Sequence, residues 1–246
     1  MPRPNRIRAG WSNMFRQVSL GLFLAGGWVT GCGQPARPSP TPTPPAVVEF
    51  QIAPTAAPTA TLPGPLVGTA LLKALQQGGY VIFFRHAATY RSQLDTDQQN
   101  LANCVTQRNL DETGQAQARA IGLAFSAANI PVGPVRASPY CRTRDTAQLA
   151  FGRVELTPDL INPSYTDDAA ESAHLEARLA QFLSDPPAAG LNTILVGHNS
   201  PSLQTITGLS IVEGEAAIFA PHGQGQFSLI GRLLPEEWTD LAGQMK

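Results

Sequence analysis

The chain has 246 residues, which is enough for one or two domains. Hydrophobic residues make up 43% of it, so a sizeable core can form, and the formal net charge is only −1. Basic residues do not cluster as they do on a nucleic-acid-binding surface, and we therefore expect no nucleic-acid partner.

The first 31 residues have the layout of an export signal. Residues 1–16 contain four arginines and no acidic residue, residues 18–29 are mostly apolar or glycine, and Thr30-Gly31-Cys32 follows. This order is typical of a secretory signal peptide, and the apolar stretch is too short to span a membrane comfortably. A cysteine directly after small residues resembles a bacterial lipobox, in which the signal is cut before the cysteine and the cysteine carries a lipid.

We therefore predict that residues 1–31 are a signal peptide and that a lipid on Cys32 anchors the exported protein to a membrane, on its periplasmic or extracellular face. The alternatives are an uncleaved membrane anchor and an ordinary signal peptide with an incidental cysteine. Residues 32–65 hold ten prolines, mostly separated by Thr, Ser and Ala, and cannot bury enough apolar surface to fold. They are interpreted as a semi-rigid linker to a domain formed by residues 66–246.

Helical and strand patterns alternate along this domain. The strongest strand signal is a short run of β-forming residues, Tyr80-Val81-Ile82-Phe83-Phe84, after two glycines. The predicted elements are, in chain order, a helix over 66–75, a strand over 80–84, a helix over 110–125, a strand over 135–137, a helix over 168–184, and strands over 193–196 and 227–230. Such alternation predicts an α/β fold, a three-layer helix–sheet–helix sandwich with a mostly parallel sheet.

Three strands of this sheet are predicted to end in cationic or imidazole side chains. Arg85 and His86 follow the first strand, Arg142 follows the second, and His198 follows the third. Because the carboxyl ends of parallel strands share one edge of a sheet, we expect these four side chains to converge in one pocket. They would repel one another without an anion, and phosphate matches the guanidinium fork. A helix start is predicted after each motif, and its free N–H groups also favour an anion.

These motifs resemble those of the histidine phosphatase superfamily, which has the phosphoglycerate-mutase-like fold. The resemblance covers nearly all of residues 66–246, with the motifs in the family's order. It is carried by Arg85-His86-Ala87, by Leu110 to Gly114 with the following Gln-Ala, by Ser138-Pro139 through Arg142 and Thr146-Ala147, and by Val196-Gly197-His198. One departure is Ala87, where the family usually has glycine.

The resemblance implies a role for each of these side chains. His86 would be the nucleophile that accepts the phosphoryl group, because imidazole is partly neutral near pH 7. Arg85, Arg142 and His198 would hold the phosphoryl oxygens and stabilise the charge that develops during transfer. Because the pocket supplies the positive charge itself, neither a metal ion nor another cofactor is expected.

The sequence offers several acids as proton donor for the leaving group. One branch of the family has an aspartate directly after the second histidine, where this chain has Asn199. Glu215 is the preferred candidate, because it opens a segment close behind the His198 motif. The other candidates are Asp167, Asp168, Glu171, Glu176 and Glu213. For each of these acids, Glu215 included, the alternative is a surface role. A reaction on a good leaving group, without any acid, is the remaining alternative.

Two further features bear on the pocket. Arg108, just before the helix over 110–125, is the best candidate for an additional phosphate-binding residue, against a structural or solvated role. Cys104 and Cys141 are the only cysteines after Cys32, and an isolated pair in an exported domain is a candidate disulfide. Such a bridge would fasten the loop that carries Arg142 to the segment before Arg108, whereas the alternative is two buried free thiols.

We therefore expect a lipid-anchored, metal-independent phosphatase that hydrolyses a small phosphorylated substrate through a phosphohistidine. Two alternatives remain at this point. One is a phosphoglycerate mutase, against which the predicted export and the short domain argue. The other is a non-catalytic surface lipoprotein that uses the same fold to bind phosphorylated or anionic ligands.

Overall fold

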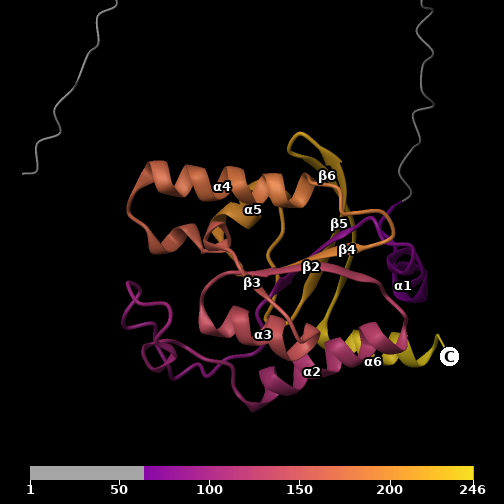
Figure 1. Cartoon of the computed structure of the whole chain (residues 1–246), viewed down its shortest axis with the longest axis horizontal. Coiled ribbons are helices and arrows are strands. Elements are labelled where there is room, and N and C mark those ends of the chain that lie inside the picture. The colour runs from indigo at the N-terminus through magenta and orange to yellow at the C-terminus, as the bar shows by residue number, and fades with distance from the viewer. Residues whose placement is uncertain (1–63, 246) are drawn as a thin grey trace, which may run out of the picture. The chain divides into compact units, whose positions relative to one another are not determined.

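The structure, a computed structural model, describes residues 64–245, so the predicted signal peptide, the lipidation site Cys32 and the linker up to residue 63 lie outside the described residues. Residues 64–245 form a single sheet with helices on both sides (Figure 1). None of the helices in this part of the chain has the length and apolar character that crossing a bilayer requires.

Six strands form the sheet in the order β3-β2-β4-β1-β5-β6. The strands are β1 (Val81–Arg85), β2 (Val132–Ala137), β3 (Glu155–Leu156), β4 (Asn192–Gly197), β5 (Ala216–Gly223) and β6 (Gln226–Leu233). β3, β2, β4 and β1 pair in parallel, whereas β5 is antiparallel to both β1 and β6. The sheet is thus mostly parallel, as predicted, and β1 lies inside it.

Helices cover the two faces of the sheet as two layers (Figure 1). The helices are α1 (Gly68–Gln76), α2 (Glu112–Ala127), α3 (Cys141–Phe151), α4 (Ala169–Ser184), α5 (Pro201–Thr207) and α6 (Pro235–Gly243), with short 3-10 turns η1 (Cys104–Thr106), η2 (Pro158–Leu160) and η3 (Pro163–Tyr165). Ile82 and Phe84 of β1 pack in the core cluster with α1, α2, α3 and α6, while Val81 and Phe83 pack in the cluster with α4 and α5. Burial on both faces explains why β1 is continuously apolar.

The elements differ from the predicted ones in three ways. The predicted sheet lacked β3 and β5, and the run Ala216-Ala217 that opens β5 is a weak strand signal because alanine is a poor β-former. The helix α6 was also absent from the prediction. Finally, the helix start expected directly after His86 is wrong: η1 is the only helical turn between β1 and α2 in the described chain. We call the irregular residues 90–109 of this segment the strap.

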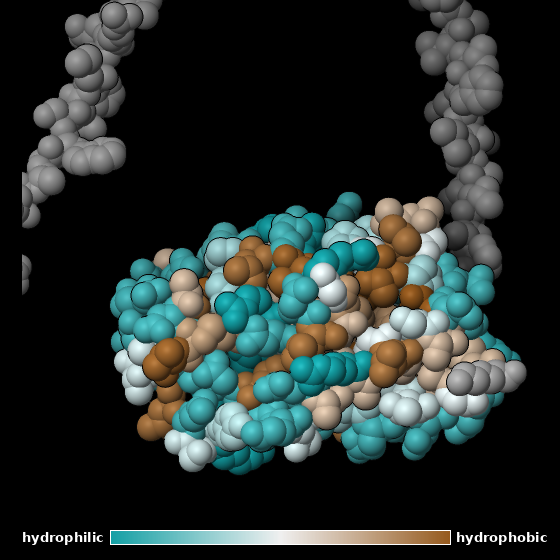
Figure 2. Space-filling model, turned by 60° about the horizontal axis from the view of Figure 1, so that its bottom comes forward, coloured by the Kyte–Doolittle hydropathy of each residue, from teal (hydrophilic) through white to brown (hydrophobic). Residues whose placement is uncertain are grey.

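The surface carries both hydrophilic and hydrophobic side chains. On the face shown in Figure 2, hydrophobic residues form separate patches among polar ones. Leu94 and Val105 of the strap and Leu123 of α2 are among the large hydrophobic side chains that are exposed. Scattered exposure of this kind is normal for a soluble domain surface.

Candidate active site

The strand register brings the two predicted histidine motifs to the same edge of the sheet. Arg85 at the end of β1 pairs with Gly197 at the end of β4, and the backbone N–H of His86 donates to the carbonyl oxygen of Gly197 at 3.0 Å. The ring centroids of His86 and His198 are 5.6 Å apart. The structure thus places both imidazoles in one site, beside the N-terminus of α3 that carries Arg142.

The turn after His86 is held by side chains from α2 and α3. The N–H of Ala87 donates to Thr146 Oγ1 at 3.0 Å, and the N–H of Ala88 donates to Gln117 Oε1 at 3.1 Å. Gly114, in the first turn of α2, lets the helix approach closely, because a Cβ there would lie 2.0 Å from the carbonyl oxygen of Ala88. The methyl group of Ala87, the departure from the family pattern, is buried in a small apolar cluster.

His86 is buried and held in one tautomer. Its Nδ1 lies 2.9 Å from the carbonyl oxygen of Ala87, and because a carbonyl can only accept, Nδ1 carries the hydrogen and Nε2 keeps its lone pair. Burial, and then the positive charges of Arg142, Arg85 and Arg108, lower the pKa of His86 well below its ordinary value. A neutral imidazole with a free Nε2 is suited to nucleophilic attack on phosphorus.

His198 is also buried and neutral. Its Nε2 lies 3.0 Å from the hydroxyl oxygen of Ser138, which follows the end of β2. Burial is the largest cause that lowers the pKa of His198 well below its ordinary value, and the charge of Arg142 adds to it. The ring of Tyr140 meets that of His198 edge-on at 5.4 Å between centroids.

Arg85 is held by the segment between α5 and β5. Its Nη1 donates to the carbonyl oxygen of Ile211 at 3.1 Å, and its Nη2 lies 3.5 Å from Glu213 Oε1. Glu213 also accepts from the Thr89 hydroxyl at 2.8 Å and lies 3.7 Å from Arg91 Nη2. Burial lowers the pKa of Arg85, while the Glu213 carboxylate opposes this shift.

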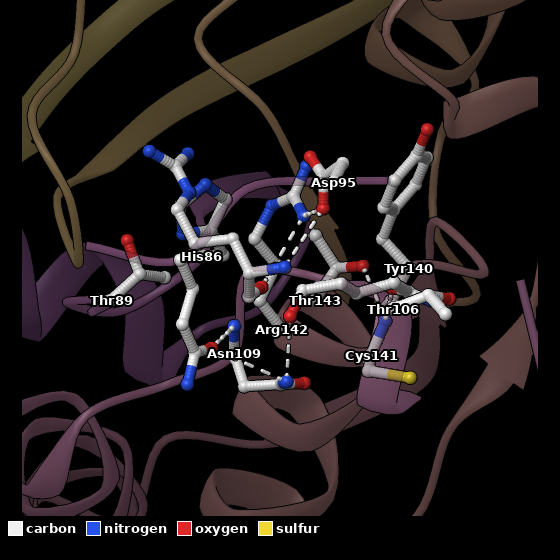
Figure 3. Close-up of polar contacts among 12 residues, drawn as sticks. His86, Thr89, Asp95, Thr106, Asn109, Tyr140, Cys141, Arg142 and Thr143 are labelled. Atoms are coloured by element: carbon white, nitrogen blue, oxygen red, sulfur yellow. Dashed lines mark hydrogen bonds and ion pairs between the residues drawn. The ribbon is translucent and has the colours of Figure 1, made fainter. Parts of the chain in front are cut away.

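Arg142 is fully buried, and Asp95 is its counter-ion (Figure 3). Its Nη1 donates to Asp95 Oδ1 at 2.9 Å, and its Nη2 donates to the Tyr165 hydroxyl at 3.0 Å. The guanidinium carbon lies 4.4 Å from the ring centroid of Tyr140. Asp95 and Tyr165 were not predicted, because Asp95 lies in the irregular strap, Tyr165 ends the short turn η3, and neither belongs to a motif.

The structure also brings Arg108 to this cluster. Its backbone N–H donates to Asp95 Oδ1 at 2.9 Å, and its carbonyl oxygen accepts from Arg142 Nη1 at 3.4 Å. The charge of Arg108 contributes to lowering the pKa of Arg85, His86 and His198.

Three guanidinium groups of the site keep a buried donor without an acceptor. The Nε atoms of Arg85, Arg108 and Arg142 are buried, and none has a hydrogen-bond partner among residues 64–245. A buried donor that stays unpaired costs about 1–3 kcal/mol. Three guanidinium groups beside two neutral imidazoles give the site a positive charge that favours an anion.

The contacts of two glutamates bear on the choice of acid. The carboxylate of Glu215 is engaged elsewhere, because Oε2 accepts from the N–H of Val212 at 2.8 Å and Oε1 accepts from Arg232 Nε at 2.7 Å. Glu215 therefore has a structural partner on β6, whereas the acid that contacts a site arginine from this segment is Glu213. Among the other candidates, Asp168 caps the N-terminus of α4.

Cys104 and Cys141 form a disulfide in the structure. The bond joins η1 in the strap to the first residue of α3, directly before Arg142. Within residues 64–245, no three His, Cys, Asp or Glu side chains gather as a metal ion would require.

Comparison with known proteins supports the family resemblance of these motifs. Residues 81–190 match the family model of the histidine phosphatase superfamily, branch 1. No curated protein matches the chain in sequence. Similar solved structures include a putative phosphohistidine phosphatase SixA from Agrobacterium tumefaciens, with 21% identity over 64% of this chain and 99% of that chain and a TM-score of 0.41. A putative alpha-ribazole-5'-P phosphatase from Escherichia coli K-12 has 15% identity over 62% of this chain and 94% of that chain, with a TM-score of 0.44.

A phosphoserine phosphatase from Entamoeba histolytica, solved as a mutant with phosphoserine, has 16% identity over 64% of this chain and 98% of that chain, with a TM-score of 0.43. The match of residues 81–190 confirms the predicted resemblance to the histidine phosphatase superfamily, and the structure gathers the motif residues of that resemblance at one sheet edge.

Proposed function

We propose that this protein is a metal-independent phosphatase that hydrolyses phosphomonoesters through a phosphohistidine at His86. The observation that carries the proposal is the convergence of His86, whose Nε2 is free, with His198 and with the guanidinium groups of Arg85 and Arg142. Guanidinium groups bind phosphoryl oxygens, and their positive charge would stabilise the charge that develops during transfer.

The reaction has two balanced steps. Nε2 of His86 attacks phosphorus, the bond from phosphorus to the ester oxygen breaks, and that oxygen takes a proton from solvent as the alcohol leaves. A water molecule then attacks the phosphohistidine and returns one proton to solvent, the phosphorus–nitrogen bond breaks, and inorganic phosphate is released. The hydrogen stays on Nδ1 throughout and is donated to the carbonyl oxygen of Ala87, which keeps the lone pair of Nε2 free for the phosphorus atom.

A cavity of about 190 Å³ next to the site favours a substrate with one phosphate group. Two of its lining residues, Tyr140 and Tyr165, also contact Arg142. The cavity is lined by Gln98, Gln99, Leu101, Tyr140, Ile161, Asn162, Tyr165, Thr166, Glu171 and Leu175. None of these residues is basic, so the cavity offers no partner for a second phosphate, which argues against phosphoglycerate mutase activity.

Export and lipid anchoring complete the proposal. They rest on the basic and apolar N-terminal segment and on Cys32 after Thr30-Gly31. In a bacterial host, the full chain should partition into the detergent phase of a Triton X-114 extract, and a Cys32→Ala variant should not carry the lipid. Equal partition of the two chains would exclude Cys32 as the anchor.

The phosphatase is tested by phosphate release from p-nitrophenyl phosphate and from a panel of phosphomonoesters. The His86→Ala variant should lose activity at least about a thousandfold, because the covalent step disappears. His222→Ala, an exposed histidine on β5, is the matched control and should keep full activity. EDTA should leave the rate unchanged. Equal rates in wild type and His86→Ala would remove the assignment and leave a non-catalytic anion-binding protein.

A further inference from the structure

The strap, residues 90–109, carries two residues of the site but has no hydrophobic core of its own. Gln107 is its one buried residue, and none of its residues belongs to a cluster of buried apolar side chains in the described part of the chain. Its ends are close together, since the N–H of Tyr90 donates to the carbonyl oxygen of Asn109 at 3.1 Å. Packing therefore does little to fix the position of the strap.

Polar contacts and one covalent bond hold the strap against α3. The N–H of Cys141 donates to Gln107 Oε1 at 2.8 Å, and Arg142 donates to Asp95 and to the carbonyl oxygen of Arg108. The disulfide from Cys104 to Cys141 lies within this group, directly beside Arg142 in sequence and four residues before Arg108. Figure 3 shows Asp95 beside Arg142, with Cys141 in the same group of residues.

We propose that the disulfide between Cys104 and Cys141 positions the strap as part of the phosphate site, so that the oxidised protein binds phosphate tightly and the reduced protein binds it weakly while the domain stays folded. The inference rests on the proposed phosphatase function. A dithiol reductant would cleave the sulfur–sulfur bond, giving two thiols in the protein and a cyclic disulfide in the reductant. Arg108 and Asp95 would then lose the covalent tie that keeps them against Arg142.

The sheet and its helices do not depend on this bond. Both main core clusters consist of residues from α1 to α6 and the strands, together with Leu160 of η2 and loop residues such as Ala128, Ile130 and Ile211. Reduction should therefore act mainly on phosphate binding, through the position of Arg108 and of the counter-ion of Arg142. This separates a positioning role from a general effect on folding.

The test measures the inhibition constant of inorganic phosphate and the KM for p-nitrophenyl phosphate, with the full chain oxidised, reduced with dithiothreitol, and reoxidised. Reduction or Cys104→Ser should raise the inhibition constant and the KM by about tenfold, as expected for the loss of one charge-assisted hydrogen bond. The change in kcat should be smaller. Reoxidation of the wild type should restore both values. The near-UV circular dichroism should persist in the reduced protein, and Ile121→Val, a mildly destabilising change in α2, should not alter phosphate inhibition.

A second variant shows whether the bond acts through Arg108. Arg108→Gln should weaken phosphate inhibition in the oxidised protein, and reduction of this variant should add little, because the two changes remove the same interaction. Unchanged inhibition on reduction, unfolding of the reduced domain, or fully additive effects of reduction and Arg108→Gln would each overturn the inference. If oxidised wild type and His86→Ala hydrolyse substrate equally, the phosphatase proposal fails instead, and calorimetric titration of the oxidised and reduced chain with inorganic phosphate still tests the role of the disulfide.

Discussion

The hydroxyl oxygen of Ser138 lies 3.0 Å from Nε2 of His198, and both side chains are buried. This nitrogen is the one hydrogen-bond partner of the hydroxyl among residues 64–245. A buried hydroxyl hydrogen without an acceptor would be costly, so the serine donates and Nε2 accepts. In that tautomer the hydrogen of His198 lies on Nδ1, from which it can be donated to a phosphoryl oxygen.

Ser138→Ala should therefore lower kcat/KM by roughly 3- to 10-fold, the loss expected for one neutral hydrogen bond. Nitrogen-15 NMR of the His198 ring should show a larger share of the other tautomer. Ser202→Ala removes another buried serine hydroxyl, on α5, and should change neither quantity. If Ser138→Ala kept both the tautomer and the activity, the serine would only pack against the ring.

The convergence of the site was predictable, because it follows from the parallel register of β1 and β4. Short apolar runs that end in Arg85-His86 and in Gly197-His198 identify strands, and strand direction then fixes the shared edge. Asp95 was not predictable in this way. It lies in the strap, where no periodic pattern relates position in sequence to position in space.

The two glutamates before β5 show a second limit of the sequence. Glu213 and Glu215 are separated only by Gly214, whose φ of +81° turns the chain between them. Propensity does not say which carboxylate such a turn directs to Arg85 and which it directs to Arg232. Glu215 was preferred because it opens a segment close behind the His198 motif, but position in the sequence does not reveal its pairing with Arg232 of β6.

Substituting each glutamate separates their roles. Glu213→Gln should raise the KM for p-nitrophenyl phosphate by roughly tenfold, because Arg85 loses its counter-ion and its fixed position. Glu215→Gln should leave kcat/KM unchanged and lower the free energy of unfolding by about 1–3 kcal/mol, because its buried carboxylate pairs with Arg232. A loss of kcat in Glu213→Gln that is larger for alkyl than for aryl phosphates would instead identify Glu213 as the proton donor.

The two buried histidines should make stability depend on pH. Their pKa values are lowered in the folded state, so below about pH 6.5 the unfolded chain binds protons that the folded chain does not. Stability is therefore full above that pH and falls as the pH is lowered, by about 1.4 kcal/mol per pH unit for each histidine. Urea unfolding at pH 7.5, 6.5 and 5.5 measures this slope, and His198→Phe should reduce it. Equal stability at pH 7.5 and 5.5 would contradict neutral, buried imidazoles.

Two glycines of α2 provide a test and a control for the role of the turn after His86. A Cβ on Gly114 would lie 2.0 Å from the carbonyl oxygen of Ala88, and a Cβ on Gly122 would lie 2.0 Å from the carbonyl oxygen of Ala150 in α3. Both Gly→Ala changes should lower the free energy of unfolding by about 1–3 kcal/mol or more, because backbone must move in each case. Only Gly114→Ala displaces the turn that fixes the His86 ring.

We therefore expect kcat/KM for p-nitrophenyl phosphate to fall at least about tenfold in Gly114→Ala and to stay near the wild-type value in Gly122→Ala, at a temperature where both variants are folded. Thermal unfolding of each variant sets that temperature. Equal activity in the two folded variants would mean that the contact between α2 and Ala88 serves stability alone, and that His86 is positioned by its hydrogen bonds to Gly197 and Ala87 without support from α2.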